Sequence, residues 1–211
     1  MDKQKYELLP NILEKYVELQ EKIKHRLLEF TQVPKEEHFY ELCFCICTPQ
    51  SRAANSLIVQ NKLTKEKFLE KGFNPTDILF EKSNYIRFHN QKAKRLLTIR
   101  EQWGEIKSTL DSDISPIEKR FWLAENINGI GLKESAHFLR NIGYKDLGIL
   151  DRHILKHLVL CGIYKETPNI STNARYLEVE KQFQNLAKKV QIPIDELDLL
   201  FWCYQTGEII K

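Results

Sequence analysis

Two residues have the types and surroundings needed for nucleophilic chemistry on carbon, Lys133 and Asp151. Lys133 follows the turn Gly129–Gly131, in what the apolar periodicity predicts to be the first turn of a helix. At a helix N-terminus the macrodipole disfavours the ammonium form and enriches the free amine, which forms Schiff bases with carbonyl carbons. The competing interpretation is a solvated surface lysine, the ordinary state of this residue type.

Asp151 precedes the helical run "RHILKHL", a position that favours an N-cap. A capping carboxylate stays ionised and rigid, so it can also stabilise positive charge that develops in a neighbouring pocket. The capping and the electrostatic interpretations of Asp151 are compatible with one another.

Gly129 and Gly131 lie in a turn between two predicted helices, "SPIEKRFWLAENI" and "LKESAHFLRNI". Glycine allows tight turning and close approach of another chain, and amides that enter a helix N-terminus suit an anionic oxygen such as a DNA phosphate. A plain helix–helix turn is the alternative, since glycine is common in turns.

The elements that must position these residues are helices almost throughout. Apolar residues recur every three or four positions in stretches that end before Pro34 and Pro193, and again near the C-terminus. Loop-forming Pro, Gly, Asn, Asp and Ser residues separate about ten such stretches. The sequence therefore predicts an all-α fold.

Composition predicts a soluble protein. The chain has 211 residues, of which 42% are hydrophobic and 29% charged, and its net charge of +3 permits a nucleic-acid partner without requiring one. It contains no apolar run long enough to span a membrane, and its first residues, "MDKQKYELLP", do not resemble a signal peptide. We therefore expect a cytoplasmic protein.

The sequence contains five cysteines and no CxxC pair. In the run "CFCIC", helical geometry spreads Cys43, Cys45 and Cys47 around the axis, which favours core packing over metal binding. We therefore expect reduced thiols, no metal site and no cofactor.

The segment "NGIGLKESAHFLRNIG…ILDRHI" resembles the helix–hairpin–helix motif and the following aspartate loop of the DNA glycosylase superfamily that includes endonuclease III. Lys133 and Asp151 match the nucleophilic lysine and the aspartate of its bifunctional members. The ending "LDLLFWCYQTGEIIK" and the segments "ELCFCICTPQSRA" and "IRFHNQKAKRL" resemble compact 8-oxoguanine DNA glycosylases of archaea and bacteria. The iron–sulfur loop of the endonuclease III branch is missing from the sequence.

This resemblance implies a two-lobed helix–hairpin–helix glycosylase fold. Residues 1–35 and 136–211 would form one lobe and residues 36–135 the other, with the active site in the cleft between them. The implied function is excision of 8-oxoguanine from double-stranded DNA, with strand cleavage at the abasic site by β-elimination, performed by a nucleoid-associated monomer. The alternatives are a glycosylase for oxidised pyrimidines and a non-catalytic DNA-binding module.

The resemblance also assigns further site residues. Phe88 would fill the gap left by an extruded base, with Arg87 and Gln50 near the partner base, although Phe88 is equally compatible with a core position. Trp202 and Lys211 would recognise the lesion. For Trp202 the alternative is core packing, and for a terminal lysine it is disorder.

Basic residues gather in the segment "NQKAKRLLTIR". They could contact phosphates or form an ordinary solvated helix face. The residues concerned are Lys92, Lys94, Arg95 and Arg100.

Overall fold

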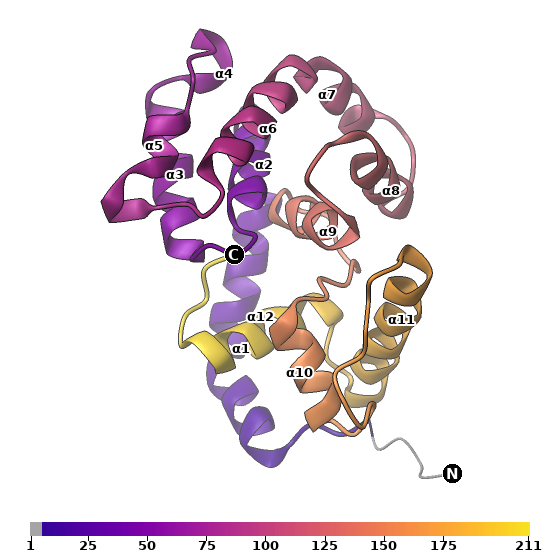
Figure 1. Ribbon diagram of the computed structural model, residues 1–211. Helices are drawn as coiled ribbons and strands as arrows, with labels where there is room; N and C mark the ends of the chain where they lie inside the picture. The colour runs from indigo at the N-terminus through magenta and orange to yellow at the C-terminus, as the bar shows by residue number, and fades with distance from the viewer. Residues whose placement is uncertain (1–5) are drawn as a thin grey trace. The chain divides into compact units, whose positions relative to one another are not determined.

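The computed structural model describes residues 6–211, and every regular element in that range is a helix (Figure 1). The α-helices are α1 (Pro10–Thr31), α2 (His38–Cys47), α3 (Ala53–Lys65), α4 (Phe68–Lys71), α5 (Thr76–Phe80), α6 (His89–Glu101), α7 (Trp103–Asp111), α8 (Pro116–Asn126), α9 (Leu132–Asn141), α10 (Arg152–Leu160), α11 (Asn173–Val190) and α12 (Ile194–Thr206). Two short 3-10 helices are η1 (Lys35–Glu37) and η2 (Lys82–Asn84). The all-α prediction is confirmed.

Residues 1–5 lie outside the described range. They include the start of the segment that we predicted not to be a signal peptide, and the start of the first predicted lobe. Within residues 6–211, no helix has both the length and the apolar character required to cross a bilayer.

The chain divides into two compact units. Of the described residues, the terminal unit contains residues 6–32, residues 143–209 and Lys211, and the central unit contains residues 33–142 together with Ile210. Helix α9, which carries Lys133, belongs as a whole to the central unit, whereas α10, which begins after Asp151, belongs to the terminal unit.

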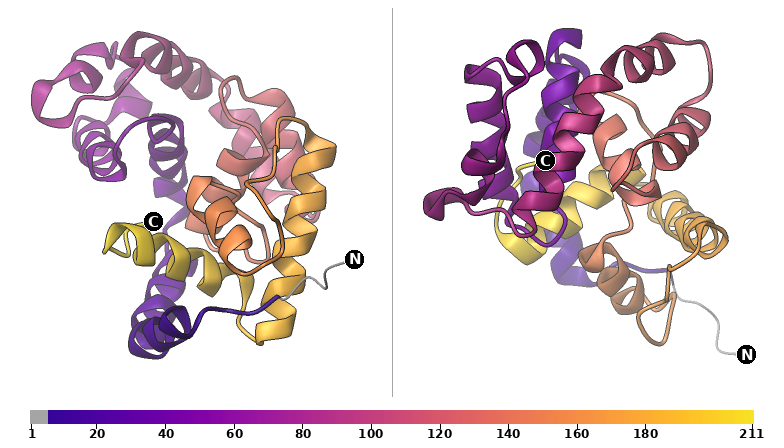
Figure 2. Two further views of the ribbon diagram at one scale, coloured as in Figure 1. Left: turned by 60° about the horizontal axis from the view of Figure 1, so that its bottom comes forward. Right: turned by 45° about the horizontal axis from the view of Figure 1, so that its top comes forward.

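In the terminal unit, α12 packs against α1, α10 and α11 (Figure 2). The apolar stripe predicted for the first helix supplies the contact surface of α1, where Ile12 and Ile23 are fully buried. From α12, Leu197 and Phe201 are also fully buried. The packing follows directly from the three- and four-residue periodicity of both helices.

Helix α2 is the core of the central unit and contacts α3, α6 and α9. Cys43, Cys45 and Cys47 are fully buried on it, which confirms the predicted core packing of the "CFCIC" run. Burial raises the pKa of the Cys43 thiol well above its ordinary value and that of Cys47 to about 12.

Candidate active site and DNA-contact turns

The predicted hairpin forms between α8 and α9. Helix α8 begins with a capping box, in which Ser115 Oγ accepts from the Glu118 amide and the Glu118 carboxylate accepts from the Ser115 amide. It ends before Ile127, and α9 begins at Leu132. The two helices and the turn that the sequence predicted are therefore present.

Of the two hairpin glycines, only Gly129 has a backbone conformation that requires glycine. Gly129 has a φ of +96°, and a Cβ atom placed there would lie 2.3 Å from Nε of Arg95. Gly131 is extended, with a φ of −115°, and the nearest heavy atom to a Cβ there would be 3.8 Å away. Gly129 thus fixes the turn and allows Arg95 to lie against it, while Gly131 is exposed at the entrance to α9.

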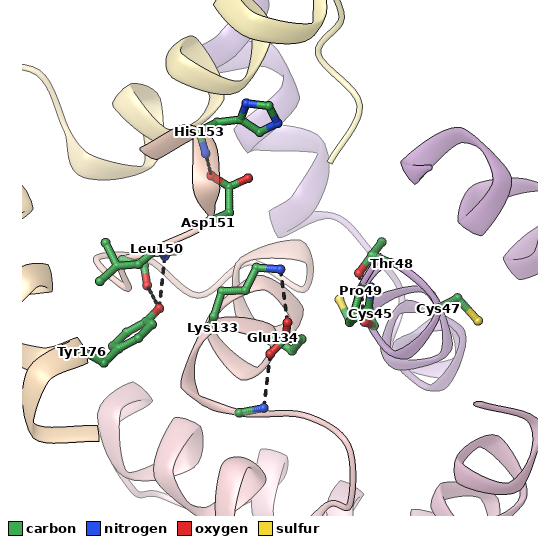
Figure 3. Close-up of polar contacts among 12 residues, drawn as sticks. Cys45, Cys47, Thr48, Pro49, Lys133, Glu134, Leu150, Asp151, His153 and Tyr176 are labelled. Atoms are coloured by element: carbon green, nitrogen blue, oxygen red, sulfur yellow. Dashed lines mark hydrogen bonds and ion pairs between the residues drawn. The ribbon is translucent and has the colours of Figure 1, made fainter. Parts of the chain in front are cut away.

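Lys133 lies in the first turn of α9 and is half-buried, with 28% of its side chain exposed. Its Nζ atom lies 3.2 Å from Oε1 of Glu134, and Oε2 of the same carboxylate accepts from the Gly131 amide at 3.3 Å (Figure 3). Glu134 therefore joins the lysine to the glycine turn. Lys133 is held in a defined position rather than freely solvated.

Asp151 caps α10, as the sequence predicted. Its Oδ1 atom accepts from the backbone amide of His153 at 2.8 Å (Figure 3) and from that of Ile154 at 2.9 Å. The two hydrogen bonds fix the carboxylate at the helix N-terminus, where the dipole favours negative charge.

The loop before Asp151 is held by two residues whose role was not predicted. Tyr176 donates its hydroxyl proton to the Gly148 carbonyl at 2.6 Å and accepts from the Leu150 amide at 3.2 Å. Glu180 accepts from the Gly148 amide at 2.7 Å. Tyr176 lies on the apolar stripe of α11, so its periodicity indicated burial, but nothing in the sequence indicated which backbone groups its hydroxyl would bind.

Trp202 is half-buried on α12, and its ring lies 5.1 Å from that of His153 in an edge-to-face arrangement. Its indole Nε1 is buried without a hydrogen-bond partner among the described residues. Burial lowers the pKa of His153, while the Asp151 carboxylate acts in the opposite direction. Lys211, predicted to recognise the lesion, is also half-buried.

The predicted DNA contacts at residues 50 and 87–88 lie in two exposed turns of the central unit. Gln50 and Phe88 both adopt the left-handed backbone conformation, with φ values of 58° and 60°. Phe88 is 45% exposed, so the alternative core position is wrong. The Arg87 guanidinium lies 5.0 Å from the centre of the Phe88 ring, within the range of a cation–π contact.

Two of the basic residues that could have contacted phosphates instead bind backbone carbonyls of the protein itself. Lys92 is 2% exposed, and its ammonium group is hydrogen-bonded to backbone carbonyls. Arg100 donates from Nε to the Leu69 carbonyl at 2.8 Å. Lys94, in contrast, is exposed. The interpretation of this segment as one solvated basic face is therefore wrong.

A model of the 8-oxoguanine DNA glycosylase family matches residues 23–192. The chain belongs to this family. A relative from Fusobacterium nucleatum, named 8-oxoguanine DNA glycosylase/AP lyase, is 39% identical over 95% of this chain and 97% of its own length. The relative of the same name from Methanocaldococcus jannaschii is 35% identical over 92% of this chain and 94% of its own.

Solved structures of family members are similar over nearly the whole length. The M. jannaschii 8-oxoguanine glycosylase/lyase in complex with a 15mer DNA containing 8-oxoguanine has a TM-score of 0.84 at 31% identity, covering 96% of this chain and all of that one. The Thermotoga maritima 8-oxoguanine DNA glycosylase has a TM-score of 0.82 at 29% identity, covering 95% of this chain and 97% of its own. Family membership therefore extends across both units of the fold.

Proposed function

We propose that this chain excises 8-oxoguanine from double-stranded DNA and cleaves the strand at the resulting abasic site. The observation that carries the proposal is the placement of Lys133, half-buried in the first turn of α9 directly after the Gly129 turn. That placement occurs in a chain that matches named glycosylase/AP lyases along almost its whole length.

In this mechanism, the free amine of Lys133 attacks C1′ of the damaged nucleotide while the bond from C1′ to the base breaks. The carboxylate of Asp151 offsets the positive charge that develops on the sugar ring. Its two backbone hydrogen bonds keep the carboxylate from rotating away during this step.

The covalent intermediate opens to a Schiff base between Nζ of Lys133 and C1′. The Schiff base withdraws electrons from C2′, so a proton leaves C2′ and the bond between C3′ and its phosphate oxygen breaks. This β-elimination cuts the strand on the 3′ side of the lesion. Water then hydrolyses the Schiff base and returns the lysine.

The remaining site residues bind and orient the DNA in this proposal. The hairpin turn at Gly129 and Gly131 approaches a backbone phosphate, because the N-terminus of a helix suits an anionic oxygen. Phe88 enters the duplex in place of the extruded nucleotide, and Arg87 and Gln50 contact the partner base. The exposure of both turns supports this assignment.

Trp202 and Lys211 form the lesion-recognition part of the proposal. The buried indole N–H of Trp202 lacks an acceptor among the described residues, and a bound base could supply one. Lys211 offers its ammonium group to the polar edge of an oxidised purine. Because the substrate is DNA, we place the protein's activity at the nucleoid.

Borohydride trapping on a duplex with a single 8-oxoguanine tests the proposal, with Lys133→Gln as the comparison. We expect a covalent adduct with the native chain and none with the variant. Binding without an adduct or base release would instead indicate a DNA-binding module. Preferential trapping on a duplex with an oxidised pyrimidine would indicate a different substrate.

Removal of Lys211 tests the recognition part by itself. The truncated chain should still be trapped on DNA with a preformed abasic site, because Lys133 and Asp151 are retained. It should lose most of its base release from the 8-oxoguanine duplex. Unchanged release would exclude the role assigned to Lys211.

A further inference from the structure

The two exposed turns at Gln50 and at Arg87–Phe88 share an unusual backbone feature. Each contains a non-glycine residue in the left-handed conformation, at Gln50 and at Phe88. This conformation is unfavourable for a bulky side chain and persists only where neighbouring contacts hold it. The contacts that hold these turns are therefore part of how they can meet a ligand.

The first turn is held by Lys92 from inside the central unit. Nζ of Lys92 donates to the carbonyls of Cys47 at 2.7 Å and Pro49 at 2.6 Å, and to Oγ of Ser51 at 3.3 Å. These three acceptors match the three donors of an ammonium group. They lie at the C-terminal end of α2 and on both sides of Gln50, so the lysine fixes the backbone from which Gln50 projects.

The same lysine is linked to the second turn. Oγ of Ser51 accepts from the backbone amide of Arg87 at 3.0 Å, so it lies between the Lys92 ammonium group and the Arg87–Phe88 turn. The backbone amide of Lys92 also donates to the carbonyl of Phe88 at 3.0 Å. One residue thus contacts both turns, through its side chain on one side and its backbone on the other.

We propose that Lys92 is a positioning residue. Together with Ser51, it holds the Gln50 turn and the Arg87–Phe88 turn in a fixed position relative to one another, as insertion into DNA requires. The proposal rests on the DNA-contact role given to these turns under the proposed function. At 2% exposure, Lys92 acts through the two turns rather than by touching the substrate.

The electrostatics of Lys92 agree with this role. Burial lowers its pKa to about 8, because the cation is removed from water and its immediate partners are neutral dipoles. A buried cation is tolerated only where its hydrogen bonds are satisfied, which ties the group closely to the carbonyls of the Gln50 turn.

The chain provides a matched control in a second buried lysine. Lys119 is 3% exposed, and its Nζ atom donates to the carbonyls of Thr109 at 3.1 Å and Leu110 at 3.0 Å at the end of α7. Lys119 therefore donates to backbone carbonyls at the end of a helix, as Lys92 does. No DNA contact is predicted at that end of α7. Lys92→Met and Lys119→Met both remove a buried ammonium that binds carbonyls, and only the first touches the two turns.

The decisive experiment uses a duplex that carries a stable abasic-site analogue opposite 2-aminopurine, whose fluorescence reports how side chains fill the gap and contact the partner base. At saturating protein, Lys92→Met should lose at least about half of the wild-type fluorescence change, whereas Lys119→Met should retain it. In parallel, single-turnover release of 8-oxoguanine should fall about tenfold or more for Lys92→Met, because misplaced positioning groups slow chemistry strongly.

Ser51→Ala keeps the test decisive if Lys92→Met does not fold. It removes only the hydroxyl that joins the Lys92 ammonium to the Arg87 amide, and it should reduce the fluorescence change in the same direction. A wild-type fluorescence change in Ser51→Ala and in folded Lys92→Met, or an equal loss in Lys119→Met, would overturn the proposal. A wild-type chain that releases no 8-oxoguanine would refute the proposed function instead, and the fluorescence comparison would still decide the role of Lys92.

Discussion

The imidazole of His157 lies flat on the phenyl ring of Phe201, with the ring centres 4.2 Å apart and the planes only 4° from parallel. His157 is fully buried between α10 and α12, and Gln205 lies within hydrogen-bond distance of its Nε2 atom at 3.2 Å. Burial lowers the pKa of His157 to about 4. The contact between these helices is therefore built around a neutral imidazole.

His157 should make the protein sensitive to acid. The unfolded chain binds a proton at this residue near pH 6.5 and the folded chain only near pH 4, so the free energy of unfolding should fall as the pH decreases through this window. The loss assigned to His157 is at most about 3 kcal/mol. Urea unfolding of the wild type and His157→Gln between pH 7 and 4 measures it. His157→Gln should show a weaker pH dependence than the wild type, because it removes the buried imidazole.

Asp151 has a capping role and a proposed catalytic role, and substitutions separate them. Asn is also a good N-cap, so Asp151→Asn should change the free energy of unfolding by less than about 0.5 kcal/mol. Because it removes the charge, it should lower single-turnover base release by about 10²-fold or more. Ser115→Ala, at the cap of α8, should do the reverse, destabilising the fold by about 1 kcal/mol with little effect on base release. Full activity in Asp151→Asn would contradict the role given to the carboxylate.

Two glycines give opposite predictions for the same substitution. Gly129→Ala places a Cβ atom against Arg95 at a φ of +96°, so it should destabilise the fold by about 1–3 kcal/mol and weaken DNA binding. Gly104 lies in α7 with no heavy atom within 4 Å of a Cβ, so Gly104→Ala should stabilise by up to about 1 kcal/mol. Thermal unfolding of both variants, with DNA affinity measured alongside, checks the pair. Equal effects would mean that the hairpin does not depend on the conformation of Gly129.

The contribution of Lys92 to the free energy of unfolding should depend on pH in alkaline solution. Its pKa is lowered to about 8 in the folded chain, whereas an unfolded lysine titrates near 10.5. The unfolded chain therefore binds more protons between these pH values, and the contribution of Lys92 to the free energy of unfolding should rise with pH across them, by at most about 3 kcal/mol. The difference in unfolding free energy between wild type and Lys92→Met, followed from pH 7.5 to 10, measures this rise. The exposed Lys94→Met should show no comparable difference.

The sequence predicted those features that depend on local pattern. Apolar spacing identified the buried face of α1, with Ile12 and Ile23 fully buried, and the position of Asp151 before an apolar run identified a cap. Glycine content located the turn at Gly129. Each of these depends on residues within one or two helical turns of one another.

Features that depend on distant backbone groups were not predictable in this way. Lys92 was assigned to a basic surface because its neighbours in sequence are basic, yet the carbonyls that bury it belong to Cys47 and Pro49. The Tyr176 hydroxyl likewise binds the loop at Gly148, far away in sequence. A side-chain type at a given periodicity indicates burial, but it does not indicate which backbone group will meet the polar end.

The burial of the cysteines has a chemical consequence for an enzyme proposed to act on oxidised DNA. Peroxides attack the thiolate form of cysteine, and burial raises the pKa of Cys161 and Cys47 to about 12, which leaves almost no thiolate at neutral pH. All five thiols are buried in the fold. The sulfur atoms should therefore react slowly with the oxidants that create the proposed lesion.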